Sequence, residues 1–189
     1  MMYKKLIYTH AAQVVPRLNL ENDISELFTE DTLLADAISI LKEKKMKIEL
    51  VALIAHALPV REGIWWGYKT LALRQADWKG IQTTALDTIE QWVKQPSEES
   101  RRKAEYLANK LELSCGPSWL AQAVFWNGSG SIIAPDQPTV LPEADLYCKA
   151  IAGAIAHSAA LPEWDNSEEY YNKSIHIALD IASGGSGQI

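Results

Sequence analysis

Apolar residues recur every three to four positions along most of the chain, the spacing that places side chains on one face of an α-helix. Leu34, Ile38 and Leu41 follow this spacing in a first helix that we expect to start near residue 31 or 32. The next segment, Lys47–Ala57, is apolar nearly all round, which predicts a central helix buried on most sides. Pro59 cannot extend that helix but suits the first turn of another. The pattern therefore predicts a tight corner between two helices.

The same period predicts five further helices beyond the one that Pro59 opens. We expect them over residues 77–94, from Pro96 to about 111, from Pro117 to 126, over 143–160 and from Asn166 to about 183. The segment 128–142 holds glycines, serines and three prolines and is interpreted as a surface loop. Residues 143–160 carry a strip of small residues, Ala150, Gly153 and Ala154, that would permit close helix packing.

These elements predict an all-α fold. A length of 189 residues suits one domain, 1–189, built as a compact helical bundle or an irregular helical array of about seven to eight helices. Residues 1–30 define no clear element, although a small strand in the first ten residues fits. The Gly- and Ser-rich residues 184–189 are expected to fray.

Charge and composition exclude several classes of function. With 18 basic and 24 acidic residues the formal net charge is -6, which disfavours a phosphate-binding face, so no nucleic-acid partner is expected. The most apolar run is too short to span a bilayer, so no membrane association is expected. No secretory signal opens the chain, and Cys115 and Cys148 show neither a disulfide framework nor a zinc-binding spacing. These features favour a cytoplasmic protein.

The sequence predicts no catalytic residue, no cofactor site and no metal site. The four histidines are scattered and belong to no tight ligand motif, and no serine lies in a nucleophile elbow. His56, within an apolar helix, is interpreted as a core group rather than a base. A catalytic triad built from residues far apart in the sequence stays an open alternative. We nevertheless expect a protein that is not an enzyme.

Trp65 and Trp66 stand side by side in the helix after Pro59. Adjacent helical positions point about 100° apart, so the two indoles must diverge, and core packing is preferred over ligand stacking for this pair. Arg61 lies in the first turn, where the helix dipole does not favour a cation. It either covers an aromatic at the surface or pairs with a buried acid that fixes the corner. The sequence leaves open whether Trp66 and Arg61 face outward to a partner.

Four stretches, residues 58–66, 92–102, 123–132 and 150–155, resemble an uncharacterised family of bacterial proteins, mostly from Gram-negative species, associated with type VI secretion gene clusters. The resemblance spans roughly residues 46 to 183. It supplies no catalytic residues. It implies a cytoplasmic accessory role, such as an adaptor or chaperone for a secretion effector or spike component.

Three functions follow as hypotheses. The leading one is a non-enzymatic helical interaction module, because seven tryptophans occur without acid-base or metal motifs, with Arg61, Trp65, Trp66 and Trp126 as candidate partner-binding residues. The alternative is a small-ligand-binding protein or enzyme whose pocket those four residues line together. A third is a homo-oligomer in which the small-residue strip, extended by His157, forms the seam between copies.

Overall fold

The computed structural model describes residues 3–18, 20, 23–134 and 136–188, and within these ranges the chain folds into eight α-helices and five short 3-10 helices. The α-helices are α1 (Leu34–Glu43), α2 (Lys47–Ala57), α3 (Val60–Ala72), α4 (Ile81–Lys94), α5 (Glu98–Lys110), α6 (Gly116–Phe125), α7 (Leu146–Ala159) and α8 (Ser167–Ser183). The 3-10 helices are η1 (Ala11–Gln13), η2 (Val15–Arg17), η3 (Ser25–Leu27), η4 (Gln75–Asp77) and η5 (Trp164–Asn166). The predicted all-α class is confirmed.

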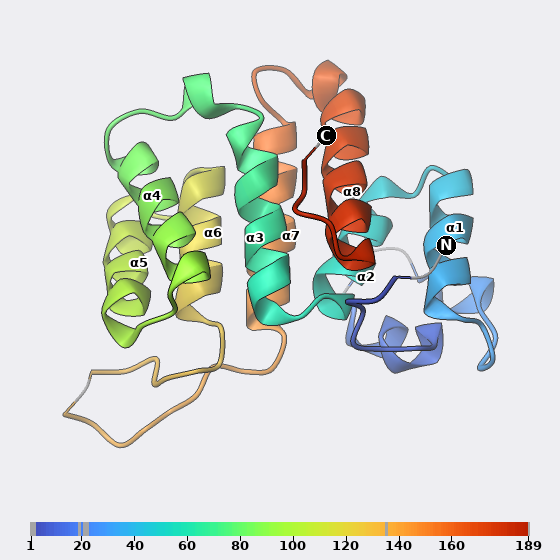
Figure 1. Ribbon diagram of the computed structural model, residues 1–189, viewed down its shortest axis with the longest axis horizontal. Helices are drawn as coiled ribbons and strands as arrows, with labels where there is room; N and C mark the ends of the chain where they lie inside the picture. Colours follow the sequence, from blue (N-terminus) through green and yellow to red (C-terminus); the bar gives the residue numbers. More distant parts are fainter. Residues whose placement is uncertain (1–2, 19, 21–22, 135, 189) are drawn as a thin grey trace.

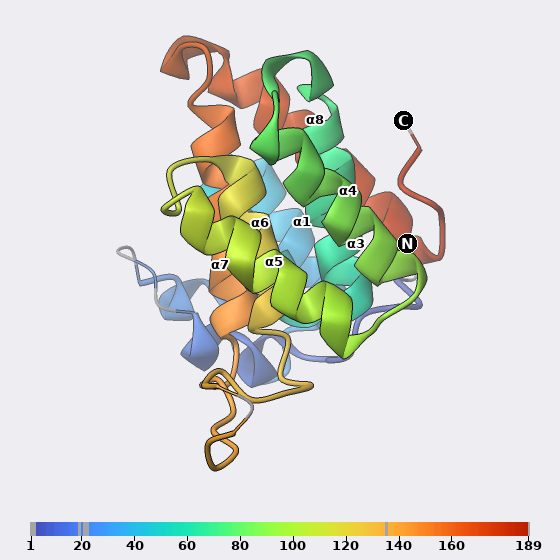
Figure 2. The same ribbon diagram turned by 90° about the vertical axis from the view of Figure 1, so that its left-hand side faces the viewer.

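The helices form an irregular array around α3 and α7 (Figure 1). Helices α4, α5 and α6 lie on one side of this central pair, and α1, α2 and α8 lie on the other. The view turned by 90° shows α4 and α5 in front and the loop between α6 and α7 extending away from the helices (Figure 2). The buried residues form one hydrophobic cluster that joins both sides of the array.

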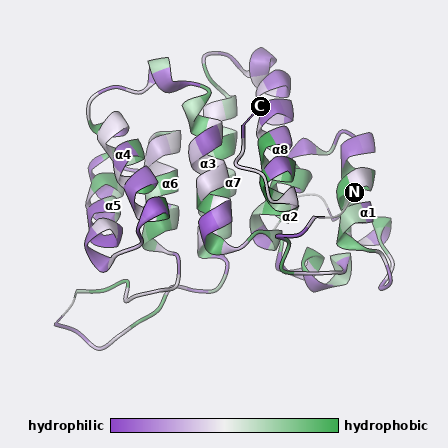
Figure 3. Ribbon diagram, in the orientation of Figure 1, coloured by the Kyte–Doolittle hydropathy of each residue, from purple (hydrophilic) through white to green (hydrophobic). Residues whose placement is uncertain are grey.

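Helix α2 is deeply embedded, as its all-round apolar pattern predicts. Every residue from Glu49 through Ala57 is buried, and α2 packs against α1, α7 and α8. In contrast, α5 buries a single stripe that includes Ala104, Leu107 and Ala108. Figure 3 shows this difference, with α5 largely hydrophilic and α2 largely hydrophobic. Hydrophobic patterning therefore determines how deep each helix lies.

Close helix crossings depend on two glycines. A Cβ atom at Gly67 of α3 would lie 2.5 Å from Leu120 Cδ1 of α6. A Cβ atom at Gly116, in the first turn of α6, would overlap Ser158 Oγ and lie 3.1 Å from the Ala154 carbonyl oxygen of α7. Glycine at these positions lets the backbones approach more closely than any side chain would allow.

The small-residue strip of α7 packs within the chain. Ala150 and Ala154 are fully buried, and a Cβ at Gly153 would lie 3.6 Å from the ring of Trp119 in α6. Among the strip residues His157 is exposed. Ala150 and Ala154 therefore cannot contribute to a seam between two copies, because they are already covered within the chain.

Helix starts differ from the expected positions by up to four residues. Helix α4 begins at Ile81 rather than residue 77, because η4 and the left-handed Gly80 (φ 56°) interrupt the chain. Helix α7 begins at Leu146, after Asp145 with φ 68°. Asn166 precedes α8 without a side-chain capping hydrogen bond. The helical period locates a helix, but backbone conformations just before it decide where it begins.

Described segments near both ends of the chain contact the helices, although a poorly defined segment 1–30 and a frayed tail 184–189 were expected. The Lys5 N–H donates to the Ala182 carbonyl (2.9 Å), and the Ile7 N–H donates to the Ala57 carbonyl (3.0 Å). The Gly187 N–H donates to Asp180 Oδ2 (2.8 Å). A small strand in the first ten residues was left open by the sequence, and the described residues there form one isolated bridge, between His10 and Leu33. Residues 1–2, 19, 21–22 and 189 lie outside the described residues.

Candidate functional site

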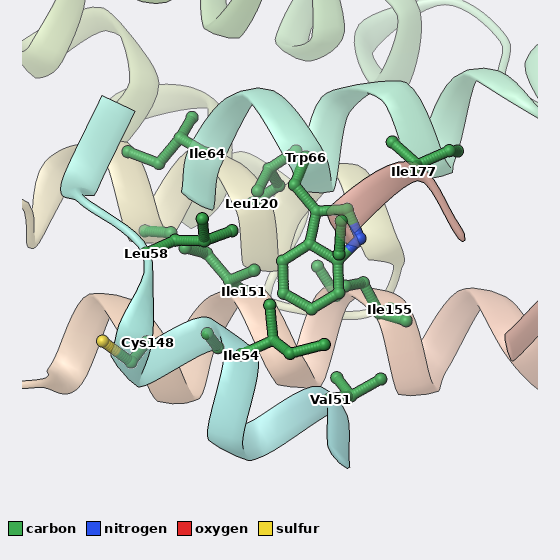
Figure 4. Packing of buried hydrophobic residues seen from close by; sticks show 14 of the residues in the cluster. Val51, Ile54, Leu58, Ile64, Trp66, Leu120, Cys148, Ile151, Ile155 and Ile177 are labelled. Atoms are coloured by element: carbon green, nitrogen blue, oxygen red, sulfur yellow. The ribbon is translucent and has the colours of Figure 1, made fainter. Parts of the chain in front are cut away.

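Trp66 lies at the centre of the core. Its side chain is 0 % exposed, and Figure 4 shows the indole pointing from α3 toward Ile54, Ile151 and Ile155. The indole Nε1 donates to the Ser174 carbonyl of α8 (2.8 Å). Trp66 therefore faces the core and not an outside partner. This tryptophan belongs to the packing between α2, α3, α7 and α8.

A sequence signal for this burial is present in α3. Gly63, Trp66, Gly67 and Thr70 recur at positions i, i+3, i+4 and i+7, and all four are buried. Two glycines on one helical stripe indicate the face where neighbouring helices come closest. If only the large apolar residues are considered, the buried stripe of α3 falls on Ile64, Tyr68 and Leu71. That choice points Trp66 away from the core.

Trp65 lies at the surface of α3, diverging from Trp66 as predicted. Its ring stacks on Tyr68 with centroids 5.2 Å apart and planes inclined by 17°. Lys69 Nζ lies 5.7 Å from the Trp65 ring centroid, a cation–π arrangement. The indole Nε1 donates to the Ser186 carbonyl (3.0 Å). Trp65 therefore anchors the segment that follows α8.

Arg61 is exposed, and its Nη2 donates to the Val93 carbonyl at the end of α4 (2.6 Å). The last carbonyls of a helix have no partner within the helix and favour a cation. Arg61 therefore caps α4 from the first turn of α3. It stabilises the corner after Pro59, but through a carbonyl, so the hypothesis of a buried acid partner is wrong.

Arg61 and Trp65 line one cleft, which we call the α3–α8 cleft. It has a volume of about 540 Å³ and lies among the N-terminal segment, the start of α3 and the ends of α4 and α8. Its lining residues are Lys5, Arg61, Glu62, Trp65, Val93, Lys94, Ile181, Gly184 and Gly185.

Basic side chains outnumber acidic ones in this lining. Lys5, Arg61 and Lys94 are basic, whereas Glu62 is the acidic lining residue. Lys5 pairs with Glu62 at 2.8 Å, and Lys94 pairs with Glu90 at 2.8 Å. The guanidinium of Arg61 contacts a carbonyl rather than a carboxylate. The cleft is thus a locally cationic feature of a chain whose net charge is -6.

Trp126 follows α6 as its C-terminal cap residue and is half-buried against the core. It does not line the α3–α8 cleft. Of the four candidate residues, the structure brings Arg61 and Trp65 together and separates them from Trp66 and Trp126. The alternative in which all four line one pocket is therefore wrong.

A second polar cluster joins two of the stretches that carry the family resemblance, 92–102 and 123–132. The Arg101 side chain is 0 % exposed and donates to both carboxylate oxygens of Glu98 at 2.6 Å. It also donates to the Phe125 and Ser131 carbonyls, each at 2.9 Å. Arg102 donates to the Ser131 carbonyl as well (2.8 Å). The two arginines fasten the start of the α6–α7 loop to α5.

From the sequence, the stretch with Pro96, Glu98 and Arg101 was either a scaffold corner or a recognition surface, and Arg101 was not selected individually because an arginine in a helix is usually solvated. The available signal is Glu98 three residues earlier, which can neutralise a buried guanidinium. Hydrogen bonds from Arg101 and then Arg102 lower the pKa of Glu98, which keeps the carboxylate ionised. The cluster is a structural anchor with every guanidinium nitrogen of Arg101 in a hydrogen bond.

The cysteines are both buried and unpaired with each other. Burial raises the pKa of the Cys148 thiol to about 12, so this thiol stays protonated at neutral pH. Among the described residues, no group of three or more His, Cys, Asp or Glu side chains is placed to hold a metal ion. Across the same residues, every helix is too short or too polar to cross a bilayer.

Comparison with known proteins identifies a family for most of the chain. A family model described as "Family of unknown function (DUF6931)" matches residues 37–182. This range includes all eight α-helices except the first residues of α1 and the last residue of α8. No curated protein and no solved structure matches the chain.

Proposed function

Because the chain belongs to this family of unknown function, we propose its role from its own surface: a non-enzymatic protein-interaction module whose α3–α8 cleft binds an acidic segment of a partner protein. The observation that carries the proposal is the presence of Arg61 and Trp65 in one cleft. Arginine and tryptophan are the residue types that most often dominate binding energy at protein interfaces.

Charge favours an acidic segment as the occupant. Lys5, Arg61 and Lys94 line the cleft on three different parts of the chain, and the Arg61 guanidinium retains donors beyond the one that contacts Val93. Val93 and Ile181 supply apolar contact area beside them. A partner segment that carries carboxylates next to an aliphatic side chain would match both features.

The resemblance to proteins associated with type VI secretion supports a biological context for this binding. The stretch 58–66 supplies Arg61, Glu62 and Trp65 to the cleft, so part of the resemblance lies in the proposed binding surface. We propose a cytoplasmic accessory protein that acts as an adaptor or chaperone. Its partner would be a secretion effector or a spike component.

The proposal is tested by co-purification from the native host with the wild-type chain and two charge-reversal variants, Arg61→Glu and Lys94→Glu. Lys103→Glu is the matched control, because Lys103 is exposed on α5 and does not line the cleft. Wild type and the control should retain a stoichiometric partner, whereas each cleft variant should lose roughly 90 % or more of it, since an interface ion pair often contributes a factor of ten.

Two results would contradict the proposal. One is the recovery of no stoichiometric partner by the wild-type chain. The other is equal capture by Lys103→Glu and both cleft variants, which would place binding elsewhere. Melting curves of all variants accompany the measurement, because Arg61→Glu also removes the cap on α4. Lys94→Glu leaves that cap in place and separates loss of binding from loss of stability.

A further inference from the structure

A second hollow lies where the end of α1 and the start of α2 face α8, and we call it the α1–α8 pocket. It has a volume of about 620 Å³. Helices α1 and α8 each pack against α2, and Figure 1 shows them on either side of it. No residue lines both this pocket and the α3–α8 cleft.

Apolar side chains form one part of the lining. Leu41 comes from α1 and Leu50 from α2, whereas Ile175 and Leu179 lie one turn apart on α8. Leu41, Leu50 and Ile175 are at most 5 % exposed, and Leu179 is partly buried above the core. This part of the pocket suits a hydrocarbon group, because contact with it removes apolar surface from water.

Two lysines line the pocket where α1 ends and α2 begins. Lys42 is exposed and forms no ion pair with any of the described residues. Lys47 pairs with Glu168 at 2.7 Å, but the Glu168 side chain is 67 % exposed, so water screens this pair. A lysine ammonium is carried on a flexible four-carbon stem, so both can reach an anionic group at this end of the pocket.

The acidic lining residue, Asp180, lies at the other end of α8. Lys47 contacts the first turn of α8 through Glu168, whereas Asp180 lies in the last turn, about 18 Å further along at 1.5 Å per residue. Asp180 Oδ2 already accepts the Gly187 N–H (2.8 Å), and Ser183 Oγ donates to the Leu179 carbonyl (2.8 Å). The pocket therefore has a basic end, and its acid is distant from that end and already hydrogen-bonded.

The basic end contrasts with the charge of the whole chain. Residues 42–47, which join α1 to α2, contain four lysines and one glutamate, although the net charge of the protein is -6. An apolar wall next to a local excess of positive charge is the arrangement that an amphipathic anion requires.

We propose that the α1–α8 pocket binds a small amphipathic anion with a hydrocarbon body and one terminal carboxylate. The carboxylate is held by Lys42 and Lys47, and the body extends along Ile175 and Leu179. One negative charge suffices, because Lys47 already has Glu168 as a partner. An eight-carbon fatty acid fits, since its ten non-hydrogen atoms need roughly 300 Å³ at about 30 Å³ each.

The probes are octanoate and octanamide, which have the same shape and differ in charge. Binding of each to the full chain is measured by NMR titration at neutral pH. We expect saturable one-site binding of octanoate, with amide shifts centred on residues 41–50 and 172–183. Octanamide should bind roughly threefold or more weakly, and about 0.5 M salt should remove most of the difference because it screens the lysines.

Lysine variants test the charged end. Lys42→Gln removes the ammonium and should weaken octanoate binding about two- to fivefold, the contribution of a solvated ion pair, without changing octanamide binding. Lys44→Gln is the matched control, because Lys44 is exposed at the end of α1 but does not line the pocket. It should bind octanoate as the wild type does.

A second pair of variants adds a charge without changing side-chain shape. Asn172 is exposed, lines the pocket and lies one turn after Glu168, near the basic end. Asn172→Asp should therefore weaken octanoate binding about two- to fivefold by repulsion and leave octanamide binding unchanged. Asn109→Asp, at an exposed position of α5, is the control and should match the wild type.

Several results would each overturn the proposal: no saturable octanoate binding, equal affinity for octanamide at low salt, or wild-type octanoate affinity in both Lys42→Gln and Asn172→Asp. Arg61→Glu separates this pocket from the α3–α8 cleft and should leave octanoate binding unchanged. Loss of octanoate binding in a folded Arg61→Glu variant would place the anion in the cleft and also overturn the proposal. Partner capture and octanoate binding can therefore fail separately.

Discussion

The indole N–H of Trp66 donates to the Ser174 carbonyl at 2.8 Å and joins α3 to α8 through the interior of the protein. Ser174 Oγ lies 3.0 Å from Thr70 Oγ1, and Tyr170 Oη donates to the Thr70 carbonyl at 3.1 Å. The two helices are thus connected by a buried polar network as well as by apolar packing. Such networks are costly to disturb, because each lost partner leaves a desolvated group behind.

The two neighbouring tryptophans should respond differently to the same substitution. Trp66→Phe removes buried ring volume and the bond to Ser174, so we expect the free energy of unfolding to fall by about 1–3 kcal/mol. Trp65 lies at the surface, so Trp65→Phe should lower the free energy of unfolding by less than about 1 kcal/mol. Urea unfolding of both variants measures the difference. Equal losses would mean that Trp66 is not the core residue of the pair.

Arg101 should be essential for the order of the α6–α7 loop. Arg101→Met leaves the Phe125 carbonyl without this donor and the Ser131 carbonyl with Arg102 as its remaining donor, and we expect the free energy of unfolding to fall by about 1–3 kcal/mol. Amide hydrogen exchange should accelerate over residues 127–134. Lys103→Met, on the exposed side of α5, is the control. Unchanged exchange in Arg101→Met would show that the loop is held by other contacts.

His56 should make stability depend on pH. Its folded-state pKa is lowered, chiefly by burial, so the unfolded chain binds a proton more readily than the folded protein does. The contribution of the neutral His56 imidazole to the free energy of unfolding is fully present above its pKa in the unfolded chain, about 6.5. This contribution is lost as the pH falls toward the lower pKa that His56 has in the folded protein. The urea midpoint should therefore fall between about pH 7.5 and pH 5, and His56→Gln should show a shallower fall. Identical slopes for the two proteins would contradict this prediction.

Two substitutions of glycine by alanine should change the stability of the protein in opposite directions. Gly116→Ala forces the new methyl group against Ser158 Oγ and the Ala154 carbonyl, and should destabilise by about 1–3 kcal/mol. Gly153→Ala meets Trp119 at an ordinary contact distance of 3.6 Å within a helix, and should stabilise by about 0.5–1 kcal/mol. Thermal melting of both variants gives the sign directly. Destabilisation by Gly153→Ala would mean that α6 and α7 tolerate no added atom there.

The helices could be predicted from the sequence because apolar periodicity is a local property. Lys47–Ala57 illustrates this, since its expected and observed bounds coincide. Which tryptophan enters the core could not be predicted in the same way. A step of 100° separates Trp65 from Trp66, but only the positions of α7 and α8 decide which of the two directions is inward.

The candidate sites could be predicted less well than the helices, because they depend on contacts between residues far apart in the sequence. Arg61 and Trp65 line one cleft and lie one helical turn apart, so their proximity follows from the sequence, whereas their role in partner binding stays a prediction. The basic residues Lys5 and Lys94 join them only through the tertiary fold. The same holds for His56 and Tyr171, which line one pocket between α2 and α7 although more than a hundred positions separate them along the chain.

The hydrogen bond from the Lys5 N–H to the Ala182 carbonyl brings the N-terminal segment beside the end of α8 at the α3–α8 cleft. An affinity tag or fusion protein close to Lys5 would lie beside Gly184 and Gly185, which also line that cleft. A tag on the N-terminal segment can therefore mask the surface whose partner is being sought. Residues 136–139 are exposed and do not line the cleft, so an internal tag there would leave the entrance free.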